Sequence, residues 1–165
     1  MVYTAISKTF NMAGLGSSCM MIPNPELKQK ISDRYDACWM FGPCDLAFTA
    51  MEAAYTHGDA WVDQQLAYLE GNVETVNSFV AEHMPGVQVT KHEGTFLMWL
   101  DMTCFGKSSQ ELTSILAKEY GLALGDGSHY GTQADGFMRL NIGCTRDTLI
   151  KGLEQMAMMY DKYVK

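Results

Sequence analysis

The chain has 165 residues, of which 47% are hydrophobic, enough for one well-packed domain or for two small units that share a core. Its formal net charge is −7 and its pI is near 4.9, and no stretch rich in Lys and Arg offsets this charge. A phosphate backbone would be repelled, so the composition argues against nucleic acid as a partner.

Cysteines and histidines give no sign of disulfides or of a metal site. The 5 cysteines are an odd count without a CxxC pair or a secretory leader, which predicts reduced thiols that pack as small core hydrophobes. The 4 histidines form no HxxxH or HExxH spacing, so we expect no zinc site. No run of about eighteen apolar residues occurs, and we therefore expect a cytoplasmic protein without a membrane segment.

The chain begins with a β-prone run, VYTAI at residues 2–6, that leads directly into Ser7 and Lys8. This order predicts that Lys8 stands at the end of a buried strand. The small-residue run NMAGLGSS at 11–18, which neither helix nor strand propensity favours, follows shortly after. On composition alone a lysine at this place is a solvated surface charge, and this is the alternative interpretation.

Residues 19–86 are predicted to be mainly helical. Asn24 has the position of an N-cap, with Pro25 at the first helical residue, and the longest periodic pattern of the chain stops before Pro85 and Gly86. The predicted elements are a strand at 19–22, helices over about 25–35, 46–55 and 61–84, and a loop, FGPCD, at 41–45.

From residue 87 onward, strand and helix patterns alternate. Ser108 with Glu111 three residues later forms a capping-box pattern, and Gly121 has the position of a helix end. The predicted elements are a hairpin of strands at 87–94 and 95–101, a helix over 108–121, strands at 122–124 and 137–144, a loop rich in Gly and Asp at 125–136, and a helix over about 146–163.

Three segments in this order resemble those of one enzyme family: SKTFNMAGL at 7–15, EGTFLMWLD at 93–101 and MRLNIGCTRDTLIKGLEQM at 138–156. The first resembles the lysine segment of the fold-type I pyridoxal-phosphate enzymes, in particular the cystathionine β-lyase/C–S lyase branch of the class I/II aminotransferase superfamily. The second resembles the strand pair of that branch's small domain, and the third resembles its C-terminal strand and helix. The likeness covers essentially the whole chain.

The resemblance implies an α/β fold of fold-type I. Residues 1–58 would be the C-terminal remnant of the large cofactor-binding domain, and residues 59–165 would be a long interdomain helix and the small α/β domain with its short, mostly antiparallel sheet. The chain would correspond to roughly the last two fifths of a complete enzyme. The family's pyridine-pairing Asp, its cofactor-stacking aromatic ring and part of its phosphate site would then lie outside it.

Lys8 is the residue expected to hold pyridoxal 5'-phosphate as a Schiff base, because lysine alone supplies a primary amine on a flexible stem. The amine must be unprotonated to attack the aldehyde, so we expect a site that disfavours its charged form. After substrate displaces it, the same amine is placed to act as general base at the substrate Cα. A β-lyase and an aminotransferase both need this step, so Lys8 leaves the two reactions open.

Arg139 is the residue expected to hold the substrate α-carboxylate, since a guanidinium offers a planar, two-pronged partner. On spacing alone, an arginine of an edge strand paired with a surface acid would be the simpler interpretation. The RLNIG match favours the substrate role, because the family holds its substrate carboxylate with the corresponding arginine. Asn141, two residues on and on the same strand face, is expected to support the guanidinium.

Two departures from the family pattern concern the cofactor phosphate. Many aminotransferases have an arginine eight residues after the lysine and a serine three residues before it, whereas this chain has Gly16 and Ala5 there. Thr4 and Ser7 are therefore the remaining candidates for phosphate contacts. Because the lyase-like branch commonly lacks that arginine too, its absence slightly favours a lyase.

The loop GDGSHYG resembles the glycine-rich segment that covers the family's substrate, and Tyr130 is expected to line it; an ordinary solvent loop is the alternative.

The family is typically homodimeric, and by resemblance residues 35–47 would approach the partner's cofactor. The sequence thus predicts part of a pyridoxal-phosphate-dependent C–S β-lyase or aminotransferase acting on a small amino acid. The alternative is a non-catalytic fragment that folds or dimerises without cofactor.

Overall fold

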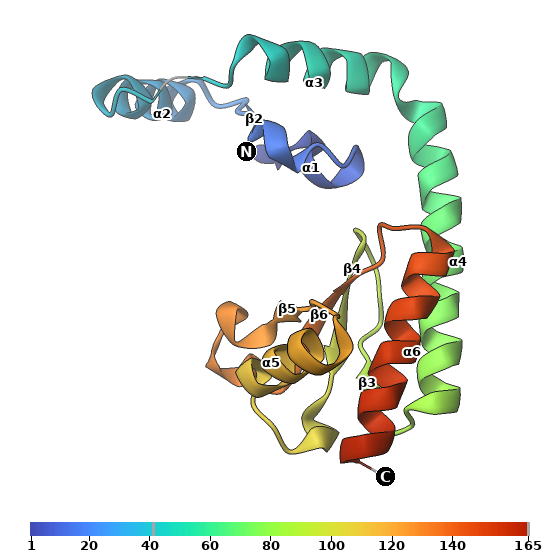
Figure 1. Cartoon of the computed structure of the whole chain (residues 1–165). Helices are drawn as coiled ribbons and strands as arrows, with labels where there is room; N and C mark the ends of the chain where they lie inside the picture. Colours follow the sequence, from blue (N-terminus) through green and yellow to red (C-terminus); the bar gives the residue numbers. More distant parts are fainter. Residues whose placement is uncertain (41, 165) are drawn as a thin grey trace. The chain divides into compact units, whose positions relative to one another are not determined.

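The structure, a computed structural model, describes residues 1–40 and 42–164 and divides into two compact units, Met1–Gln65 and Leu66–Lys165 (Figure 1). The boundary lies inside the long helix α4 (Asp59–His83). The assignment of residues 1–58 and 59–165 to a large and a small domain of a longer enzyme stays a prediction. Phe41, part of the predicted loop at 41–45, lies outside the described residues.

The first unit combines a two-stranded antiparallel ladder with short helices. Asn24 caps a helix as predicted, because its Oδ1 accepts a hydrogen bond from the Leu27 backbone N–H at 3.0 Å. The elements are β1 (Val2–Thr4), α1 (Ile6–Thr9), η1 (Ala13–Leu15), β2 (Cys19–Met21), α2 (Pro25–Ala37), α3 (Asp45–His57) and the start of α4.

The expectation of a buried strand running into Lys8 is wrong in two respects. The strand ends at Thr4, and Lys8 lies within the one-turn helix α1. The strand is also exposed at Val2 and Tyr3, since β2 is its only paired neighbour among the described residues. Ala5 stays extended as the N-cap, and the helical turn that begins at Ile6 buries this side chain completely.

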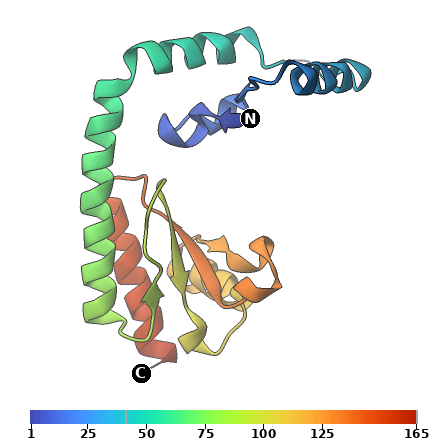
Figure 2. The same ribbon diagram turned by 180° about the vertical axis from the view of Figure 1, so that it is seen from behind.

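The second unit is a two-layer α/β structure built on one antiparallel sheet in the order β3-β4-β6-β5 (Figures 1 and 2). This confirms the predicted hairpin, the strand that carries Arg139, and the short antiparallel sheet. The elements are α4, β3 (Gln88–Val89), β4 (Leu97–Asp101), η2 (Thr103–Phe105), α5 (Ser109–Tyr120), β5 (Gly125–Asp126), η3 (Gly127–Tyr130), η4 (Thr132–Ala134), β6 (Phe137–Asn141) and α6 (Arg146–Tyr163).

Helices α4, α5 and α6 pack on one face of this sheet, and α4 and α6 lie side by side in both views (Figures 1 and 2). Alternate residues of β4 and β6 point into the shared core, as the period of two requires. The opposite face keeps half-buried side chains, including Trp99 and Arg139. The core residues of the two strands are Met98, Leu100, Met138 and Leu140.

Two further predictions need correction. The strand expected at 122–124 is absent from the described residues: Gly121 ends α5 at φ 64°, Leu122 and Leu124 pack against the core without pairing, and the ladder begins at Gly125. The cysteines are free thiols, but none is a buried core residue.

Within residues 1–40 and 42–164, no helix is long and apolar enough to cross a membrane, and no cluster of His, Cys, Asp and Glu could hold a metal ion.

Asn72 ties α4 to the end of β6 through a fully buried side chain. Its Nδ2 donates to the carbonyl oxygens of Ile142 and Cys144 at 2.8 and 3.2 Å, and its Oδ1 accepts from Arg146 Nε at 2.9 Å. A polar side chain at a buried helix position is stable only when its hydrogen bonds are satisfied. Asn72 therefore fixes the loop between β6 and α6.

We predict that Asn72→Ala lowers the free energy of unfolding by roughly 2 to 4 kcal/mol, because Arg146 Nε and the carbonyl oxygens of Ile142 and Cys144 lose their hydrogen bonds to the buried side chain. Urea denaturation followed by circular dichroism measures the change. Asn77→Ala, at an exposed position of the same helix, is the matched control and should change stability little. Equal stability of the two variants would contradict the role given to Asn72.

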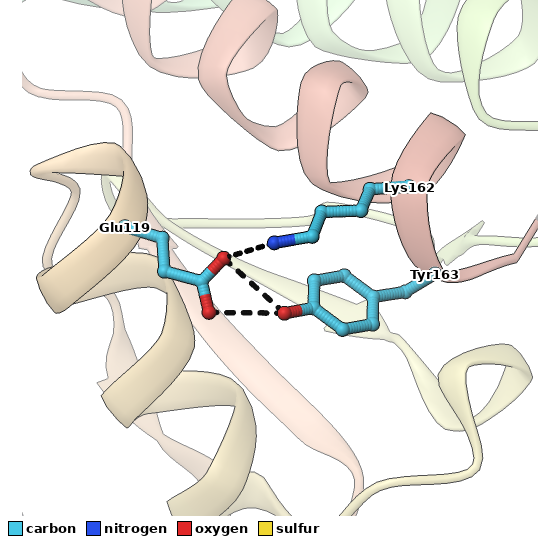
Figure 3. A network of polar contacts seen from close by, with 3 residues as sticks. All are labelled: Glu119, Lys162 and Tyr163. Carbon is cyan, nitrogen blue, oxygen red and sulfur yellow. Dashed lines mark hydrogen bonds and ion pairs between the residues drawn. The ribbon is translucent and has the colours of Figure 1, made fainter.

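Glu119 joins the end of α5 to the last turn of α6 (Figure 3). Its carboxylate accepts hydrogen bonds from Lys162 Nζ at 2.6 Å and from Tyr163 Oη at 2.9 Å. The bond from Lys162, followed by that from Tyr163, lowers the pKa of Glu119 below its ordinary value of 4.5, and the same contact raises the pKa of Lys162. This exposed contact is one of the polar links between α5 and α6, beside the hydrogen bond that Gln155 Nε2 donates to the Tyr120 carbonyl.

A carboxylate with a lowered pKa in the folded state adds stability above its ordinary pKa, and this stability is lost as the pH falls through the folded value. We therefore predict that Glu119→Gln lowers the Tm at about pH 7, and that the difference from the unaltered chain shrinks as the pH falls below the ordinary pKa of 4.5. Thermal melts across this range test it. Glu154→Gln, an exposed position of α6, should show no such pH-dependent difference.

Candidate active site

The Lys8 segment is held by the two residues on the other side of its helical turn. Ile6 and Phe10, four positions apart, are 0% and 8% exposed and share one face, which leaves Lys8 on the exposed side. The Phe10 N–H donates to the Ile6 carbonyl at 3.1 Å, and Asn11 then takes a left-handed conformation with φ 54°. The lysine is thus presented at the surface of the first unit by a fixed backbone.

Phe10 is itself enclosed by aromatic rings from two helices. Its ring meets Tyr55 edge-on at 5.7 Å between centroids and lies nearly parallel to Trp61 at 6.3 Å. A Cβ at Gly58 would lie 2.3 Å from Phe10 Cε1, so the junction of α3 and α4 needs a glycine there. Sequence reasoning missed this contact, although a glycine between two helical patterns is its signal.

The two hydroxyls predicted for the cofactor phosphate lie close to Lys8 in the chain. Thr4 Oγ1 is hydrogen-bonded to Tyr55 Oη at 2.8 Å, and Ser7 is half-buried beside Lys8 on α1. The first unit therefore carries a primary amine on α1 and one hydroxyl on each of β1 and α1. The burial expected around Lys8 is not provided by this unit, where the lysine is exposed.

Arg139 lies on β6 between β4 and β5, so the interpretation as an edge-strand arginine is wrong. The ion pairs among residues 1–40 and 42–164 join His83 to Glu82, Lys91 to Glu93 and Lys162 to Glu119, and none involves Arg139. Its guanidinium instead lies over the ring of Tyr130, 5.0 Å from the centroid. A half-buried guanidinium without an acidic partner in the described part of the chain is suited to an anionic ligand.

Tyr130 is placed by the turn η3, which is ordered rather than an unstructured loop. Asp126 Oδ1 accepts hydrogen bonds from the backbone N–H and the hydroxyl of Ser128 at 2.8 and 2.7 Å. The structure therefore brings Tyr130 and Arg139 together, and the expected place of Tyr130 beside the substrate stays a prediction. Asn141 is not brought to the guanidinium: it is exposed, and its Oδ1 accepts a hydrogen bond from Gly143 N–H at 2.8 Å.

Gly125 makes room for Arg139 from the neighbouring strand β5. The two residues are directly paired, and a Cβ at Gly125 would lie 3.1 Å from Arg139 Cβ and 3.2 Å from its Nε. Any larger residue would press on the arginine stem. A glycine within a strand indicates that a neighbouring group approaches the backbone closely. The sequence did not identify Arg139 as that neighbour of Gly125, because the strand was predicted at 122–124.

The comparisons with known proteins show the family to which this α/β chain belongs. The sequence model for the aminotransferase class I and II family matches residues 1–156, so the chain belongs to this family. Cystathionine beta-lyase PatB of Bacillus subtilis is 38% identical over 152 residues, covering 92% of this chain and 39% of that protein. This confirms the resemblance to the cystathionine β-lyase/C–S lyase branch.

Solved structures agree with this placement. A PLP-bound protein from Clostridium difficile 630 has a TM-score of 0.87 and 34% identity, over 94% of this chain and 40% of that one. Cystalysin of Treponema denticola, whose structure contains pyridoxal 5'-phosphate, has a TM-score of 0.88 and 25% identity, over 97% and 41%. The predicted fold-type I class is confirmed. The chain spans about two fifths of the length of its curated relatives.

Proposed function

We propose that this chain is the C-terminal part of a pyridoxal-phosphate-dependent C–S β-lyase that acts on a small amino acid. The family match and the relation to a cystathionine beta-lyase support the proposal. The single structural observation that carries it is the half-buried guanidinium of Arg139, which has no acidic partner in the described part of the chain. Aminotransfer is the second candidate, favoured by the family to which the chain belongs.

The residues of the first unit fit pyridoxal 5'-phosphate by their chemistry. Lys8 supplies the primary amine that an aldehyde requires, on a short helix fixed by Ile6 and Phe10. Ser7 and Thr4 supply hydroxyls that can donate to phosphate oxygens, although Thr4 must share its hydroxyl with Tyr55. When bound, the cofactor supplies an electron-accepting ring that stabilises negative charge at the substrate Cα.

The chain's own residues then have distinct tasks. Arg139 binds the α-carboxylate through two parallel N–H groups, and Tyr130 covers the guanidinium so that it stays oriented. The Lys8 amine removes the proton from the substrate Cα and returns it to an acceptor atom later in the cycle. In a β-lyase a thiolate leaves from the substrate β-carbon after the proton has been removed from Cα. In an aminotransferase the proton is returned to an atom other than Cα. Both reactions begin with the same proton removal, so Lys8 would serve either one.

The assembly and the location are also proposals. A homodimer is supported by the exposed aromatic side chains of Tyr35 and Trp39, which are 40% and 79% exposed in the first unit and would suit a buried interface. By resemblance, residues 35–47 would approach the partner's cofactor. A cytoplasmic location stays a prediction from the sequence.

Borohydride reduction tests the proposal. The purified chain and the full-length protein are each mixed with pyridoxal 5'-phosphate, reduced and digested, and the modified lysine is located by mass spectrometry. We expect the adduct on Lys8 of the full-length protein in preference to exposed Lys28 on α2. Equal modification of Lys8 and Lys28 in the full-length protein would contradict the proposal. An adduct absent only from the isolated chain would assign the non-catalytic alternative to the fragment alone.

A further inference from the structure

Trp99 is the cross-strand partner of Arg139. The two residues are directly opposite in the β4–β6 register, so their side chains share the face of the sheet that the helices leave uncovered. Both side chains are half-buried. Gly125 flanks Arg139 on the other side and offers no side chain. Among its two cross-strand partners, therefore, only Trp99 can constrain the arginine through its side chain.

The indole of Trp99 is held from two directions. It lies nearly parallel to Phe137, with centroids 5.9 Å apart, and it meets the ring of Tyr130 edge-on at 5.5 Å and 89°. Tyr130 in turn presents its face to the Arg139 guanidinium at 5.0 Å. A chain of ring contacts thus runs from the sheet through Trp99 to the group that would bind the carboxylate.

Open space beside this cluster makes the constraint necessary. Trp99, Tyr130 and Phe137, together with residues 131–134, line a pocket of about 360 Å³. Tyr130 is 55% exposed and precedes Gly131, whose φ of 137° and ψ of 157° suit glycine alone. Without the indole, the tyrosine ring has room to turn into the pocket and leave the guanidinium.

We infer that Trp99 is a positioning residue for substrate binding: it orients Tyr130, and through Tyr130 it holds the Arg139 guanidinium ready for a carboxylate. This inference rests on the proposed function of Arg139. It concerns the orientation of a side chain rather than the stability of the fold. Its consequences are therefore expected in KM for the amino acid more than in kcat or in Tm.

The experiment compares Trp99→Leu, which removes the ring, with Trp99→Phe, which keeps a smaller one. Phe79→Leu, a half-buried aromatic on α4 outside the site, is the control for lost apolar volume. The first readout needs no ligand: the Nε–Hε NMR signal of Arg139 in the labelled chain, which the tyrosine ring current displaces. The second is steady-state kinetics of the full-length enzyme with L-cysteine, alongside Arg139→Lys.

We expect Trp99→Leu to shift the Arg139 signal toward the position of an exposed arginine and to raise KM by roughly three- to tenfold with little change in kcat. Trp99→Phe should change the Arg139 signal and KM only slightly, and Phe79→Leu should leave both unchanged. An unmoved Arg139 signal in Trp99→Leu would overturn the inference whatever the function. An unchanged KM in Trp99→Leu would also overturn the inference if Arg139→Lys raises KM. If neither variant changed KM although the signal moved, the proposed role of Arg139 would fail and the inference with it.

Discussion

Replacing Lys8 with alanine is expected to lower kcat of the full-length enzyme by roughly 10²- to 10⁴-fold, the usual range for loss of a positioned acid–base group. Lys8→Arg should fail equally, because a guanidinium keeps the charge but is no primary amine and does not release its proton near neutral pH. The effect should be confined to chemistry, since α1 depends on Ile6 and Phe10 for its packing and Lys8 is exposed.

The measurement is pyruvate release from L-cysteine in parallel with amino transfer to an added keto acid. Both reactions need a base at the substrate Cα, so both should be lost together in the Lys8 variants. Lys28→Ala, on the exposed helix α2, is the control and should retain both. Retention of either reaction by Lys8→Ala at near its original rate would show that another amine acts as the base. The ratio of the two reactions in the unaltered enzyme decides between lyase and aminotransferase.

Local signals in the sequence predicted the helices well. The capping box of Ser108 and Glu111 and the N-cap Asn24 each satisfy backbone donors within a few residues, so their effect does not depend on the rest of the fold. Local signals do not fix the bounds of the strands, because strand pairing is set by distant partners. Leu122 and Leu124 have the apolar pattern of a strand, yet they pack in the core while the ladder starts at Gly125.

The candidate site shows the same division between local and distant information. Lys8 and Arg139 could be named because each stands in a short segment that resembles a known family. The residues that hold them could not, since Gly58 meets Phe10 and Gly125 meets Arg139 only after the elements come together. Trp99 is separated from Arg139 by forty residues of sequence and becomes its neighbour only through the sheet register. A glycine or tryptophan in a strand pattern names no partner by itself.

Substituting Arg139 with lysine is expected to raise KM for the amino-acid substrate by roughly 10- to 100-fold, with kcat changed much less. A lysine keeps the positive charge but loses the two parallel donors that match a carboxylate, and a charge-assisted hydrogen bond contributes about 1.5 to 3 kcal/mol. Initial rates at varied substrate concentration separate the two constants. An unchanged KM would mean that the carboxylate is bound elsewhere.

Arg146 is the matched control, because it too lies over a tyrosine ring, that of Tyr68, at 5.2 Å. Two of its donors have acceptors within the protein: Nε donates to Asn72 Oδ1 at 2.9 Å and an Nη donates to the Tyr68 carbonyl at 3.2 Å. Arg146→Lys should therefore lower Tm and leave KM unchanged, the reverse of Arg139→Lys. Two arginine–tyrosine pairs of similar geometry thus differ in one respect. Arg146 uses its donors within the protein, whereas the Arg139 guanidinium has no acceptor among the described residues and is available to a ligand.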